Sequence, residues 1–157
     1  GESVTHLDAG VPLLLRRPDS AFTLANFMRA NIYSAFATLA MGLEILRKEN
    51  VAVNTLLGHG GIFKTPGVAQ RYLAAAAGAP VTCMETAGEG GSYGMALLAA
   101  YRLHRADGEA LAAYLNRCVF ADAQSTTLFP DPAEQSGFAA FLTQYQTALK
   151  AERAAVK

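Results

Sequence analysis

The longest hydrophobic pattern in the chain is helical and lies in its first third. Seven apolar side chains recur at steps of three to five residues between Leu24 and Leu46, which predicts one amphipathic helix. Its N-cap oxygen comes from Asp19, Ser20 or Thr23, and its end falls near residue 50. The short run 11–17, bounded by a glycine and a proline, predicts a strand before it.

Two units of strand, glycine-rich loop and helix follow this helix. The second half of the apolar run 51–57 predicts a buried strand, and the glycine cluster 58–61 comes directly after it. A second strand, 81–84, precedes the glycine cluster 88–91. This order predicts a parallel pair of strands joined by a right-handed crossover.

The helices of these two units have recognisable ends. Thr65 and Pro66 are expected to cap and start the first helix, and Gly78 is expected to end it. The second helix is expected over roughly 92–105.

The last third of the chain gives weaker signals. A helix is expected from Asp107 or Gly108 through Leu115, and a strand around 126–129. Asp131, Pro132 and Glu134 form the pattern of a capping box. The final helix that they start carries its apolar side chains on one side: Phe138, Phe141, Leu142, Tyr145 and Leu149.

Composition narrows the class of protein. The 157 residues are 52% hydrophobic, which fits one globular domain, and 13 basic residues balance 13 acidic ones, which argues against a nucleic-acid partner. No apolar run is long enough for a membrane span, and the first residues do not resemble a signal peptide. Cys83 and Cys118 fit no metal-binding spacing, so we expect buried free thiols and a cytoplasmic protein. The polar start followed by a long helix is expected of a piece of a longer chain.

The two glycine clusters are the candidate binding residues. Loops after parallel strands meet at one edge of a sheet, where open α/β sheets bind ligands, and glycines there let backbone N–H groups approach an anion. The pattern therefore indicates a nucleotide or another anion between 58–65 and 88–92. The alternative is that these glycines form only tight turns, in which case the chain would be a non-catalytic interaction module.

Three other motifs have partial matches at these loops. The run 58–65 resembles a Walker A loop, but Phe63 stands where its second glycine is needed. Ser92 lies in a G-x-S-x-G match, which makes a serine hydrolase the alternative enzyme, although Ser92 comes late after the strand and the chain order of a triad is missing. A lone histidine such as His59 is more often a turn residue than a metal ligand.

The motifs together resemble the carboxy-terminal domain of the FGGY family of carbohydrate kinases. The likeness rests on the loop 58–66, on Gln70, on the strand entry 78–81, and on Glu89 with 94–96. The segment 26–30 is similar to the family's second signature, except that Tyr33 and Ser34 stand where Glu-Gly is usual. The pentulose kinases, the xylulokinase and ribulokinase branch, look closest.

This resemblance implies an α/β, actin-like (ribonuclease H-like) ATPase domain, present as an incomplete carboxy-terminal half over residues 1–157. It implies ATP, Mg²⁺ and a ketose sugar as ligands. Gly61 and Thr65 are carried over as nucleotide contacts, with Gly60 and Lys64 as further candidates. Glu89 matches a family glutamate whose place at a helix start explains it equally well.

The resemblance also defines what the chain is expected to lack. The family's catalytic aspartate and first phosphate loop match no motif here, so no catalytic residue and no metal ligand is assigned. The chain alone is expected to be inactive as a kinase. An open sheet edge leaves homodimer formation as a further expectation.

Overall fold

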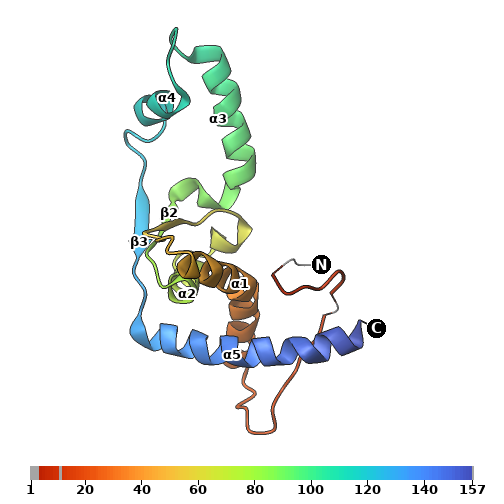
Figure 1. The fold of residues 1–157 in the computed structure, drawn as a ribbon. Helices are drawn as coiled ribbons and strands as arrows, with labels where there is room; N and C mark the ends of the chain where they lie inside the picture. The colour runs from red at the N-terminus through yellow and green to blue at the C-terminus, as the bar shows by residue number, and fades with distance from the viewer. Residues whose placement is uncertain (1–3, 11, 157) are drawn as a thin grey trace.

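A computed structural model describes residues 4–10 and 12–156 of the chain, and its elements follow in the order α1, β1, η1, α2, β2, η2, α3, α4, β3 and α5 (Figure 1). The first helix, α1, spans Leu24–Lys48 and confirms the helical pattern. Of the three N-cap candidates Thr23 is the one used, because its side chain accepts a hydrogen bond from the Asn26 N–H at 3.2 Å.

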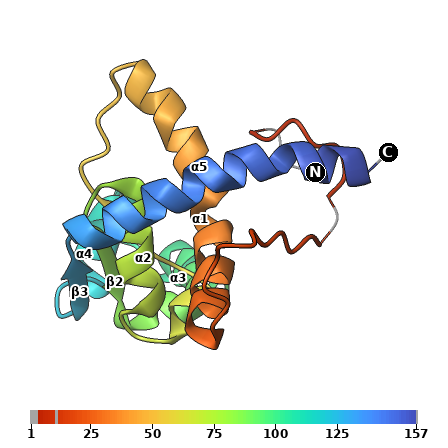
Figure 2. The ribbon, with the colours of Figure 1, turned by 90° about the horizontal axis from the view of Figure 1, so that it is seen from below.

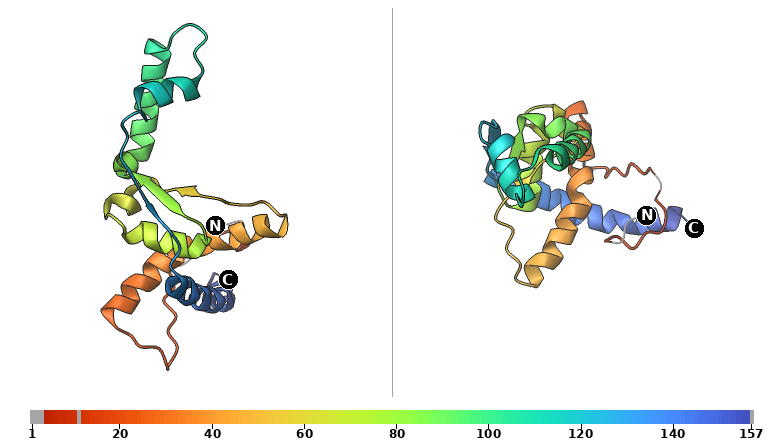
Figure 3. Two further views of the ribbon diagram at one scale, coloured as in Figure 1. Left: turned by 90° about the vertical axis from the view of Figure 1, so that its left-hand side faces the viewer. Right: turned by 90° about the horizontal axis from the view of Figure 1, so that it is seen from above.

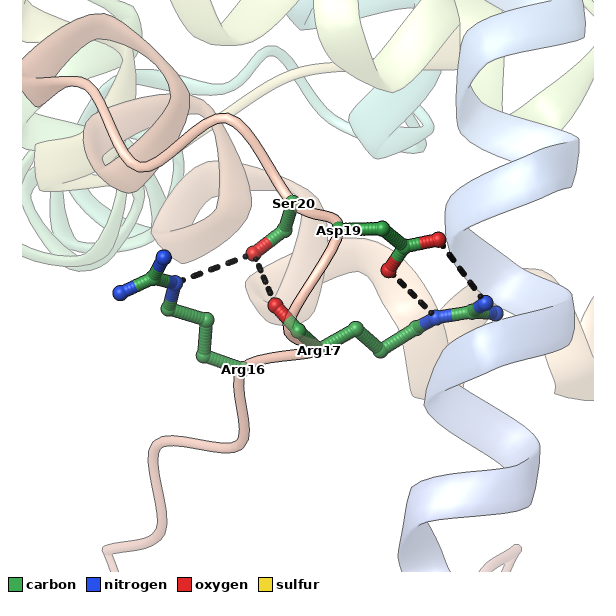
Figure 4. Close-up of polar contacts among 4 residues, drawn as sticks. All are labelled: Arg16, Arg17, Asp19 and Ser20. Atoms are coloured by element: carbon green, nitrogen blue, oxygen red, sulfur yellow. Dashed lines mark hydrogen bonds and ion pairs between the residues drawn. The ribbon is translucent and has the colours of Figure 1, made fainter.

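The strand expected over 11–17 is not formed by its described residues, 12–17, and Val11 lies outside the described residues. The chain turns after this segment instead. Arg17 makes two 3.1 Å contacts with the Asp19 carboxylate, and the Ser20 hydroxyl donates to the Arg17 carbonyl at 2.7 Å (Figure 4). The described residues 12–17 pair with no strand of the described sheet, and an apolar run forms a strand only when it has such a partner.

A mixed sheet of three strands forms the centre of the fold. Strands β1 (Leu56–Leu57) and β2 (Val81–Met84) pair in parallel, as predicted. The third strand, β3 (Ser125–Leu128), pairs antiparallel with β2. The expectation that the first strand is buried was wrong for Leu57, which is 63% exposed, because β1 is an edge strand.

Helix α2 (Val68–Ala77) joins the two parallel strands, but it does not begin as the sequence indicated. Gly61–Lys64 forms a 3-10 helix, η1, and the chain then turns through Pro66 and Gly67. Gly67 has φ 75 and ψ −23, the conformation of the third residue of a type II turn, for which Pro-Gly is a favoured pair. Thr65 therefore does not cap α2. The predicted end is confirmed, since Gly78 is left-handed with φ 63.

The core lies where α1, α2 and the last helix, α5 (Pro132–Ala155), pack together (Figure 2). Asp131 caps α5 by accepting from the Glu134 N–H at 2.9 Å, which confirms that half of the capping box. Tyr33 lies at the centre of the core, 5% exposed, with its ring against Tyr72 and Phe138. A residue that departs from the FGGY signature thus serves as a core side chain.

The helices α3 (Gly90–His104) and α4 (Leu111–Cys118) extend away from this core (Figures 1 and 3). A short 3-10 helix, η2 (Glu85–Glu89), connects β2 to α3, so Gly90 and Gly91 belong to the helix rather than to a loop. Cys118 is exposed, which corrects the expectation that both thiols are buried; the two cysteines are free. No helix within 4–10 or 12–156 is both long enough and apolar enough to span a membrane.

Candidate functional site

The two glycine-bearing loops meet at the carboxyl ends of the parallel strands. The Gly60 N–H donates to the Ala87 carbonyl at 2.7 Å, and the Lys64 ammonium lies 2.6 Å from a Glu89 carboxylate oxygen. The His59 side chain reaches the second loop as well, because a Cβ on Gly90 would lie 3.0 Å from the His59 Cβ. The predicted placement of both loops on one edge of the sheet is therefore confirmed.

A cavity of about 590 Å³ opens beside these loops. Its lining comes from five parts of the chain: the η1 helix with the turn that follows it, helix α2, the end of β2, the η2 helix, and the start of β3. The lining residues include Phe63, Lys64, Thr65, Gln70, Cys83, Glu85, Gly88, Glu89, Ser125 and Thr126.

The four residues expected to contact a nucleotide do not all occupy the same place. Lys64 and Thr65 line the cavity, whereas Gly60 and Gly61 lie just before its wall. Gly60 uses its N–H for Ala87, so that amide is not open to a ligand. Gly61 is exposed, and no atom lies within 4 Å of the position a Cβ would take, so its backbone can be approached from solvent.

The wall of the cavity that strand β3 forms could not be predicted from the glycine clusters. Strand β3 brings Ser125 and Thr126 beside the loops, although they are far along the chain. Gln70, 3% exposed, holds them there. Its amide N–H₂ donates to the Val81 and Thr126 carbonyls, both at 2.8 Å, and its oxygen accepts from the Thr126 hydroxyl at 3.3 Å. Gln70 is the one sequence feature that could have indicated this wall. It stands in an otherwise largely apolar helix, and a buried side-chain amide needs polar partners from elsewhere in the fold.

Gly58 is closely packed against two residues that line the cavity. A Cβ at this position would lie 2.6 Å from the Phe63 ring and 2.7 Å from the Cys83 sulfur. Burial raises the pKa of the Cys83 thiol, and the Gly58 N–H acts in the opposite direction more weakly. Cys83 is thus a neutral packing thiol rather than an activated nucleophile.

The charges around the cavity are few. Among the described lining residues Lys64 is the cation, and Glu85 and Glu89 are the anions. Within the described ranges no three His, Cys, Asp or Glu side chains gather closely enough to hold a metal ion.

Residues 1–103 match the family model described as the FGGY family of carbohydrate kinases, C-terminal domain. The chain belongs to this family. The match confirms the resemblance found in the sequence, and an FGGY carbohydrate kinase domain of this kind implies an actin-like fold, with which the mixed α/β architecture is consistent. Comparisons with curated proteins and with solved structures give no match.

The matched residues reach almost to the end of α3, so both loops of this FGGY domain lie within them. Ser125 and Thr126, which complete the cavity wall, lie beyond the match.

The serine-hydrolase alternative is not favoured. Ser92 lies in the first turn of α3, where its hydroxyl donates to the Glu89 carbonyl at 3.2 Å, as residues near helix starts commonly do. It follows a 3-10 helix rather than the sharp strand-to-helix turn that a nucleophile elbow requires.

Proposed function

We propose that this chain supplies part of the ATP site of a sugar kinase that phosphorylates a ketose such as xylulose or ribulose. The observation that carries the proposal is the cavity beside the two glycine-bearing loops, at the carboxyl end of β2. Ligands bind at this edge in open α/β sheets, and the chain's family is one of carbohydrate kinases.

The residues present fit a nucleotide. The volume of about 590 Å³ lies in the range of roughly 300–1,000 Å³ that small-molecule sites occupy. The Thr65 hydroxyl and the Lys64 ammonium would hold polar parts of the ligand, and the exposed backbone at Gly61 would lie along it. ATP, when bound, supplies the phosphoryl group for transfer to a sugar hydroxyl. The chain's own contribution is to bind and orient the nucleotide.

Magnesium fits this arrangement only together with the nucleotide. Mg²⁺ in kinases is commonly held by one or two carboxylates and by the phosphates, so it needs no cluster of three protein ligands. Glu85 and Glu89 are the carboxylates nearest to the proposed site. We assign no catalytic base in this chain, and we expect the purified chain not to phosphorylate ketoses.

Calorimetric titration of the chain with ADP and ATP, each with Mg²⁺, tests the proposal. We expect weak saturable binding that Thr65→Val weakens about two- to tenfold, because one hydrogen bond is lost. Thr147→Val is the matched control, since Thr147 is exposed on α5 away from the cavity, and it should leave the affinity unchanged. Absence of binding, or equal losses in both variants, would remove the proposal.

A further inference from the structure

The cationic side chain of the cavity forms an ion pair with a carboxylate of the same cavity. Lys64 from η1 and Glu89 from η2 both line the cavity, with their charged atoms 2.6 Å apart. The Lys64 stem lies directly over Gly88, where a Cβ would come within 2.9 Å of the lysine Cγ. A glycine at this position therefore lets the lysine cross to Glu89.

This pairing has a consequence for any anion that enters. With Lys64 neutralised by Glu89, the remaining charge among the described lining residues is that of Glu85. A phosphate would then meet a wall without an available cation. To bind Lys64, the phosphate must displace the Glu89 carboxylate. The free energy of the Lys64–Glu89 ion pair therefore reduces the net binding free energy of the anion.

We propose that Glu89 is a positioning residue that holds Lys64 at the cavity rim and competes with anionic ligands for it. A phosphate exchanges places with the Glu89 carboxylate on the Lys64 ammonium. This inference rests on the proposed function, because it assumes that the cavity takes a phosphate-bearing ligand. It adds a specificity element: weakly charged ligands do not displace Glu89, and polyphosphates do.

Breaking the Lys64–Glu89 ion pair costs little free energy, because both side chains are exposed. The two side chains are 58% and 68% exposed, and ion pairs at such sites are weak, so separation leaves no buried charge behind. The loops also remain joined when the pair opens, because the Gly60 to Ala87 hydrogen bond does not involve either side chain. Replacing either residue should therefore leave the fold intact.

A double-mutant cycle with inorganic tripolyphosphate at low salt tests the proposal. Glu89→Gln frees Lys64 and should tighten binding by about two- to fivefold, the equivalent of one exposed ion pair. Lys64→Met should weaken binding by about tenfold or more, because a charged hydrogen-bond donor is lost. In the Lys64→Met background, Glu89→Gln should give no gain, since the carboxylate acts through the lysine.

Glu85→Gln is the matched control, because it removes a carboxylate from the same cavity wall without touching the ion pair. Any gain it gives should persist in the Lys64→Met background. Three outcomes would overturn the proposal. Glu89→Gln could tighten binding in the Lys64→Met background as well, or it could tighten binding in neither background. Tripolyphosphate could also fail to bind to the wild type, to both single variants and to the double variant of the cycle.

Titration with ADP under the same conditions separates this inference from the proposed function. ADP binding that depends on Thr65 but is unaffected by Glu89→Gln removes the inference alone. The expected coupling between Glu89→Gln and Lys64→Met in tripolyphosphate binding supports the inference. If ADP then binds no more tightly than tripolyphosphate, the result counts against a nucleotide site.

Discussion

Gly60 and Ala87 join the two glycine-bearing loops directly, through a hydrogen bond of 2.7 Å from the Gly60 N–H to the Ala87 carbonyl. Gly60 makes this bond with φ 106 and ψ 175, a region that is essentially restricted to glycine. The glycine is therefore explained by the connection between the loops, and not by contact of its N–H with a ligand.

Gly60→Ala should destabilise the chain although there is room for the added methyl group. No atom lies within 4 Å of the Cβ position, so the cost is that of the backbone conformation alone, about 1–3 kcal/mol. Urea unfolding measures it as a lower midpoint at an unchanged slope. Gly61→Ala is the control, since Gly61 is equally open and has no positive φ, and it should change the midpoint little.

Gln70→Met should reduce the free energy of unfolding by about 2–4 kcal/mol. The change leaves the carbonyls of Val81 and Thr126 without their side-chain donor at a buried site, and each such loss costs about 1–3 kcal/mol. Gln146→Met on the exposed face of α5 should have an effect near zero. Similar midpoints for the two variants in urea unfolding would show that the Gln70 contacts contribute nothing.

The elements with a strong local signal were predictable from the sequence. The helix α1 has a regular apolar stripe, and α2 ends at a glycine because only glycine adopts φ 63 readily. The start of α2 was not predicted. Thr65-Pro66 fits both a capped helix and a turn, and Gly67 decides between them by taking a left-handed conformation.

The candidate site was predictable only where chain neighbours build it. The shared edge of the two loops followed from the parallel pairing of β1 and β2. The wall formed by β3 could not be foreseen, because its antiparallel position depends on contacts between residues far apart in the chain, such as Gln70 with Thr126. The Lys64 to Glu89 pair is equally non-local.

Tyr33 should make the stability of the chain sensitive to alkaline pH. Burial and then the Glu134 carboxylate, which accepts from the Tyr33 hydroxyl at 3.0 Å, raise the pKa of Tyr33 to about 12. The unfolded chain releases this proton near pH 10, so the folded state binds more protons between these values and the free energy of unfolding falls as pH rises from 10 to 12.

The comparison of wild type with Tyr33→Phe isolates this contribution, because the other tyrosines are common to both chains. Thermal unfolding should show a smaller loss of stability between pH 9 and pH 11 in the variant. At neutral pH the variant should be less stable, since Glu134, which also pairs with Arg71, loses one buried donor. Parallel pH profiles for the two chains would show that Tyr33 does not titrate abnormally.

Gly58→Ala should destabilise the chain for a different reason from Gly60→Ala. Gly58 has no positive φ, so alanine fits the backbone, but its methyl group would lie 2.6 Å from the Phe63 ring and 2.7 Å from the Cys83 sulfur. Such overpacking costs about 1–3 kcal/mol. Shortening the opposing side chain in Gly58→Ala/Phe63→Leu should recover part of the loss, which would appear as a favourable coupling energy in urea unfolding. Strictly additive effects would mean that the ring is not what the methyl group meets. Because Phe63 also lines the cavity, displacement of its ring by Gly58→Ala alone should weaken nucleotide binding as well.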